Sequence, residues 1–151
     1  MRAEQFGLKR EVEYGTPEQN ESALTIVADV KAEGDAALLR YTERHDGVKL
    51  DASSLRVTQA EIEAAYGEVD AAFLEAIREA AANIRAFHEK QMRNSWMDVQ
   101  PDGTMLGQIM RPLQRVGVYV PGGKAAYPSS VLMNVIPAQV AGVPEIVMVT
   151  P

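Results

Sequence analysis

The side chains best suited to chemistry stand near the end of the chain. Residues 116–120 form an apolar run, Val-Gly-Val-Tyr-Val, and Pro121 follows directly. This run predicts a buried strand with Tyr119 at its carboxyl end, where open α/β sheets bind their ligands. A tyrosine ring there could pack on a flat ring of a ligand and use its hydroxyl as a hydrogen-bonding group. The alternative is a half-buried strand tyrosine, and the pattern by itself favours that structural role.

The loop after this run contains Gly122, Gly123 and Lys124. Backbone N–H groups in such a loop could hold a phosphate, with the lysine as counter-charge. The loop lacks both the GxGxxG and the GxxxxGKS/T patterns, however. The sequence therefore favours a tight turn in which glycine adopts a positive φ.

The remaining reactive side chains form no recognisable catalytic or metal-binding pattern. The chain has two histidines, His45 and His88, and no cysteine, whereas a zinc site needs about four ligands. His88-Glu89 does not begin an HExxH motif, because Met92 occupies the second histidine position. Ser129 and Ser130 lack a GxSxG elbow, so capping of a helix is the favoured role. We therefore predict no catalytic residue and no metal ligand in this chain.

Composition restricts the class of protein. The 151 residues are 46% hydrophobic and 24% charged, which is typical of a soluble globular chain of about one domain. A net charge of -6, with basic residues interleaved among acids, argues against nucleic-acid binding. No apolar run is long enough for a transmembrane helix, and the N-terminus lacks the apolar core of a secretory signal. These features, and the absence of cysteine, fit a cytoplasmic protein with no membrane partner.

The first two-thirds of the chain is predicted to be helical. Residues 20–33 carry apolar positions at helical spacing, and Asp35 is expected to cap a second helix that ends at Asp46-Gly47. A short strand is expected at residues 55–57. Thr58 then begins a capping box that is completed by Glu61. Asp70 is expected to cap a longer helix whose core stripe is Phe73, Ile77, Ala80, Ile84 and Phe87.

The last third changes to strand-like patterns. Residues 95–100 and 104–110 flank Pro-Asp-Gly and predict a hairpin. The strand at 116–120, a buried helix over about 129–141 and an apolar strand at 145–149 predict a βαβ unit with parallel strands. Pro137 is expected to kink or divide that helix. We place a boundary near residues 111–115, dividing the chain into a helical and hairpin part, 1–114, and the first βαβ unit, 115–151.

These patterns coincide with those of a known family. The pieces VGVYVPGG, YPSSVLMN, IPAQVAGV and EIVMVTP follow one another within residues 112–151, and upstream the stretches LRVTQAE and NIRAFHEKQ also match. Over most of residues 20–151 the chain closely resembles the N-terminal part of the histidinol dehydrogenases. It departs from the family at His45, where an aromatic residue is common, and residues 1–15 match nothing that we can place.

The resemblance implies a fold, an activity and cofactors. The family oxidises L-histidinol to L-histidine through an aldehyde, with two NAD, in zinc-dependent homodimers. Its fold has incomplete Rossmann-like α/β domains similar to those of aldehyde dehydrogenases, so residues 1–114 would belong to the first such domain and 115–151 would begin the NAD-contacting part. Tyr119 and Pro121 are the implied NAD-contacting residues. The zinc ligands, the acid-base pair and most substrate contacts are implied to lie later in the sequence.

Two alternatives remain open. A related dehydrogenase could act on a different alcohol, because the substrate contacts lie elsewhere. A stand-alone interaction module would account for the short length. Against the module, a parallel sheet of two strands leaves faces and edges uncovered, which suggests a truncated domain that continues beyond residue 151.

Overall fold

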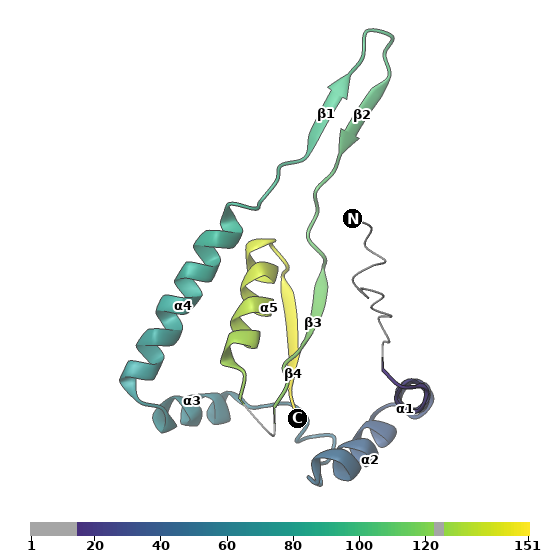
Figure 1. Cartoon of the computed structure of the whole chain (residues 1–151), viewed down its shortest axis with the longest axis vertical. Helices are drawn as coiled ribbons and strands as arrows, with labels where there is room; N and C mark the ends of the chain where they lie inside the picture. The colour runs from purple at the N-terminus through teal and green to yellow at the C-terminus, as the bar shows by residue number, and fades with distance from the viewer. Residues whose placement is uncertain (1–14, 123–125) are drawn as a thin grey trace, which may run out of the picture. The chain divides into compact units, whose positions relative to one another are not determined.

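The computed structural model describes residues 15–122 and 126–151 and has mixed α/β architecture. Its elements fall into two compact units that divide after Arg56. The first unit holds helices α1 (Pro17–Glu33) and α2 (Asp35–Asp46), and the second holds all the other elements (Figure 1). The boundary near residues 111–115, between the hairpin and the βαβ unit, stays a prediction.

The first unit is a pair of helices held together by polar contacts and one small core residue. Ala37 of α2 is fully buried, and α1 and α2 are in contact. The Tyr41 hydroxyl donates a hydrogen bond of 2.6 Å to Asp29 Oδ2, across the two helices. Arg40 forms two hydrogen bonds with the Glu33 carboxylate, which keep the pKa of Glu33 below its ordinary value. The pair therefore has defined contacts between its helices but only a small apolar core.

The junction between these helices corrects one prediction. Gly34, with φ of 61°, occupies the N-cap position of α2, and Asp35 is the first helical residue. The Asp35 carboxylate thus lies in the first turn, where it favours the positive end of the helix dipole without acting as the cap. Gly47, with φ of 70°, ends α2 as the Asp-Gly turn predicted.

The strand predicted at residues 55–57 is absent. Asp51 instead organises a turn, since its Oδ1 accepts hydrogen bonds from the backbone N–H groups of Ser53 and Ser54 at 2.8 and 3.0 Å. Such local bonds give the backbone an alternative to a strand ladder. No neighbouring strand pairs with this stretch among the described residues, so nothing offsets that alternative.

Helices α3 (Gln59–Glu68) and α4 (Ala71–Glu89) begin at the predicted caps. Thr58 and Glu61 form the expected capping box, and Asp70 Oδ1 accepts from the Phe73 N–H at 2.6 Å. The core stripe of α4 differs from the prediction, because Phe73 and Phe87 are exposed. The half-buried positions are Leu74, Ile77, Ala80, Ala81, Ile84 and His88. The face of α4 that packs against the rest of the unit is therefore rotated slightly from the predicted face, which included the two phenylalanines.

The capping box of α3 gives a testable pH dependence. The backbone N–H of Thr58, and then its hydroxyl, hydrogen-bond to the Glu61 carboxylate and hold the pKa of Glu61 below its ordinary value of 4.5. Because the folded-state pKa is lowered, the ionised Glu61 carboxylate stabilises the helix at pH values above the ordinary pKa. This contribution is lost as the pH falls through the folded-state pKa. We expect Thr58→Ala to weaken the cap by about 1 kcal/mol and to raise the Glu61 pKa. Carboxyl titration by NMR checks this, with Thr58→Ser as the control that keeps both bonds; an unchanged Glu61 pKa in the alanine variant would contradict it.

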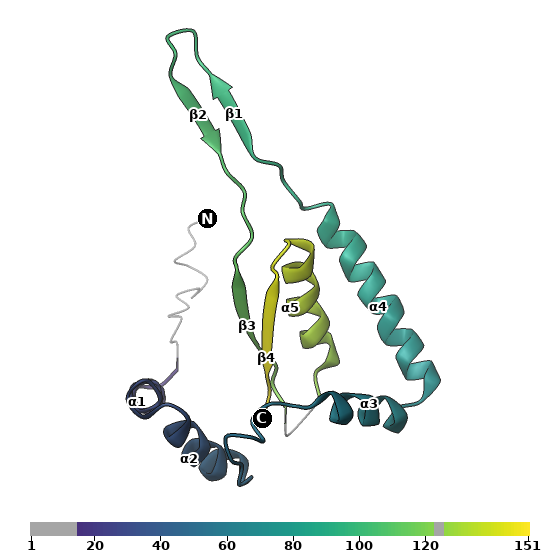
Figure 2. The same ribbon diagram turned by 180° about the vertical axis from the view of Figure 1, so that it is seen from behind.

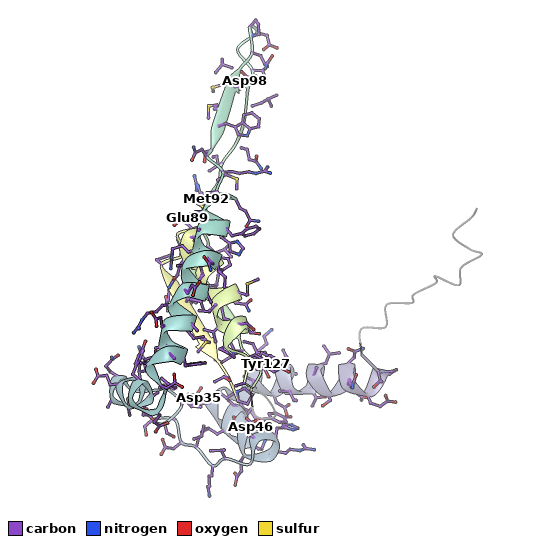
Figure 3. All side chains as sticks on the ribbon, turned by 60° about the vertical axis from the view of Figure 1, so that its left-hand side comes forward. Asp35, Asp46, Glu89, Met92, Asp98 and Tyr127 are labelled. Carbon is purple, nitrogen blue, oxygen red and sulfur yellow. The ribbon has the colours of Figure 1, made fainter. Side chains whose placement is uncertain are left out.

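Strands β1 (Trp96–Val99) and β2 (Met105–Gln108) form the predicted antiparallel hairpin, with Gly103 at φ of 88° in its turn. Its base is closed by Ser95, whose Oγ accepts from the Met110 N–H at 2.8 Å. Gly107 is required by space, because a Cβ there would lie 2.6 Å from the Trp96 carbonyl oxygen. Figure 3 labels Glu89 and Met92 at the end of α4 and Asp98 on the hairpin, whose side chains project on both faces.

The rest of this unit is the predicted βαβ arrangement. Strands β3 (Arg115–Tyr119) and β4 (Glu145–Val149) pair in parallel, and α5 (Pro128–Val140) packs on β3. Helix α5 lies between α4 and the strand pair (Figures 1 and 2). The residues that become buried are Val118, Val120 and Ile136. An ion pair between Arg115 and Glu145, at 2.7 Å, joins the first registered residues of the two strands.

Helix α5 starts one residue earlier than predicted, and Pro137 does not divide it. Tyr127 occupies the N-cap position without a side-chain hydrogen bond, so Ser129 and Ser130 are helical residues and not caps. Pro128 explains the earlier start, since its fixed φ suits the first helical position. The helix runs undivided through Pro137 and ends before Gly142, whose φ is 83°. In the part of the chain that the structure describes, no helix is long and apolar enough to cross a membrane.

Candidate functional site

The candidate site lies at the carboxyl end of the parallel strand pair. Tyr119 and Val149 are the last registered partners of β3 and β4. The Val120 N–H donates a 3.0 Å hydrogen bond to the Val149 carbonyl, which extends the ladder by one step. Pro121 and Gly122 follow on one strand, and Thr150 on the other. The backbone leading into the candidate loop is therefore held firmly up to Val120.

Tyr119 lies on the open face of this strand pair. Successive side chains alternate between the faces of a strand, and Val118 and Val120 are buried on the face that α5 covers. Tyr119 therefore points to the opposite face, where its side chain is 62% exposed. Its registered partner Val149 and the nearby Val147 are exposed as well. The ring is not half-buried in this structure and is free to contact a ligand or a covering segment.

The conformation of Gly122 differs from the left-handed turn that its sequence pattern favoured. Its φ is not positive, so the prediction of a left-handed turn residue is wrong at this position. A Cβ on Gly122 would lie 3.0 Å from Thr150 Oγ1 and 3.4 Å from Pro151 Cδ. The first distance is tighter than an ordinary Cβ contact, so glycine suits the close approach of the two loops. Gly123 and Lys124, the rest of the suggested phosphate cradle, lie outside the described residues.

The sequence alone did not suggest Thr150 as a neighbour of this loop. The contact joins residues after two different strands, so no local spacing signals it. The parallel register was the one available indication, because it brings the carboxyl ends of both strands to the same edge of the sheet. Pro121, predicted from the family resemblance, is exposed at that edge.

The other candidate groups are not brought together. The His45 ring stacks on Tyr41, with 6.0 Å between ring centroids, in the first unit. His88 Nδ1 lies 2.7 Å from Gln91 Oε1 in the second unit. Over residues 15–122 and 126–151, no three histidine, cysteine or acidic side chains gather in a way that could hold a metal ion. The described residues thus offer an exposed strand edge but no cluster that could hold a metal ion.

Comparisons with known proteins identify similar sequences and a similar fold. A family model described as histidinol dehydrogenase matches residues 9–151. A histidinol dehydrogenase of Geobacillus kaustophilus is 60% identical over 144 residues, covering 95% of this chain and 34% of the relative. One of Bacillus subtilis is 53% identical over 149 residues, covering 99% of this chain and 34% of the relative.

The crystal structure of histidinol dehydrogenase from Elizabethkingia anophelis has the same fold over this region. The TM-score is 0.82 at 39% identity, over 94% of this chain and 32% of that structure. The chain therefore spans about a third of the length of the relatives that it matches.

Proposed function

We propose that this chain, which belongs to the histidinol dehydrogenase family, is the N-terminal part of an NAD-dependent enzyme. That enzyme oxidises L-histidinol to L-histidine through the aldehyde. The observation that carries this proposal is the 60% identity to a protein named histidinol dehydrogenase over 95% of the chain. The parallel strand pair, with an exposed tyrosine at its carboxyl end, supports a dinucleotide contact in this part of the enzyme.

The described residues fit NAD at this edge in one respect, because the Tyr119 ring is exposed for aromatic packing. When bound, the nicotinamide supplies a hydride acceptor for each of the two oxidation steps. The chain's own part is to bind and orient: Tyr119 packs on a ring of the cofactor, and Pro121 forms a rigid wall that excludes water beside it.

The remaining features of the enzyme are proposed to lie outside this chain. They are zinc dependence, the acid-base residues, most contacts to L-histidinol, the second subunit of a homodimer and a cytoplasmic location. The residues described here gather no trio of metal-binding side chains, so no step is assigned to zinc through them. A related dehydrogenase for another alcohol would share this segment, and turnover of a panel of alcohols by the full-length enzyme separates the two activities.

Tyr119→Ala is expected to weaken NAD binding in the full-length enzyme, with residues beyond 151 supplied by the Geobacillus kaustophilus relative. Loss of aromatic packing and of one hydrogen bond costs about 1–3 kcal/mol, or roughly 5- to 150-fold in affinity. Titration of the protein with NAD measures this loss. Tyr66→Ala is a matched control, because Tyr66 is equally exposed, at 60% against 62%, but lies on α3.

Two results decide this prediction. Tyr119→Phe should keep most of the affinity, because it retains the ring and loses only the hydroxyl. If Tyr119→Ala bound NAD as tightly as the unsubstituted enzyme, the assignment of Tyr119 to the cofactor would be wrong. A loss of affinity that equals that of Tyr66→Ala would point to a general effect of removing exposed aromatic surface.

A further inference from the structure

We draw no further inference here: the strongest candidate, the exposed apolar face that Met97, Val99 and Met105 form on the β1–β2 hairpin, carries none, because nothing in the structure shows what covers it.

Discussion

The isolated 151-residue chain is expected to form no NADH from L-histidinol, with or without added zinc. An enzyme accelerates a reaction by groups that stabilise the transition state, and a single edge of the kind proposed to contact the cofactor binds the ground state about as well. The chain contains two histidines and no cysteine, so it is poor in the residues from which zinc sites and acid-base pairs are made. The expected rate is that of the uncatalysed background.

The positions of these histidines strengthen the expectation. His45 is on α2 in the first unit and stacks on Tyr41, whereas His88 is on α4 in the second unit beside Gln91. Neither has an acidic neighbour hydrogen-bonded to its ring among the contacts described. A catalytic pair needs its members within hydrogen-bond reach of the same reacting group.

NADH absorbance in the presence of L-histidinol, NAD and zinc measures this activity, with the full-length enzyme as the positive control. Co-expression with the rest of the Geobacillus kaustophilus relative as a second polypeptide should restore turnover if both pieces assemble. Histidinol-dependent NADH formation by the pure 151-residue chain would contradict the prediction. It would also show that the residues of the complete active site lie within this segment.

Sequence reasoning succeeded where structure depends on neighbours within one turn. The capping box of Thr58 and Glu61, the Asp70 cap and the glycines that end helices act over three or four residues, so their spacing is visible in the sequence. It failed where two local options compete. At residues 51–57 the side-chain bonds of Asp51 prevailed over the apolar residues that suggested a strand.

The same limit applies to the candidate site. The apolar run and its position before Pro121 were enough to predict that Tyr119 ends a strand, and the structure places it there. The tight contact at Gly122 was not predictable, because the atom nearest to an added Cβ belongs to Thr150, far along the chain. The exposed side of α4 was misjudged for a similar reason: Phe73 and Phe87 fit the helical period, but the partner helix α5 packs on a neighbouring face.

The isolated chain is also expected to self-associate. Among the described residues of the second unit, 57–122 and 126–151, only three apolar side chains, Val118, Val120 and Ile136, are buried, whereas much larger apolar groups remain exposed. They include the open sheet face (Tyr119, Val147 and Val149) and the hairpin (Trp96, Met97, Val99, Met105 and Leu106). A further apolar groove of about 290 Å³ on α3 is lined by Val57, Glu61, Ile62, Ala65, Tyr66, Val69 and Leu74.

Energetics favour covering these surfaces. Burial of one large apolar side chain contributes about 1.5–3 kcal/mol, so even a few contacts in a dimer offset the entropy of association. Parallel sheets are normally covered on both faces, and a two-stranded hairpin is marginal by itself in water. In a full-length enzyme other parts of the protein would cover these surfaces, and in the isolated chain a second copy is the available cover.

Light scattering over a range of concentrations is expected to show a mass that rises above that of the 16.5 kDa monomer. Placing charges on the open sheet face, with Val147→Lys and Val149→Glu, should shift the distribution toward monomer, because charged groups resist desolvation. The same two charges placed at Gln100→Lys and Thr104→Glu, in the polar turn of the hairpin, are the matched control and should not. A monodisperse monomer at every concentration, with slow amide exchange throughout residues 115–149, would mean that two strands and their helices form a self-sufficient core despite the exposed face.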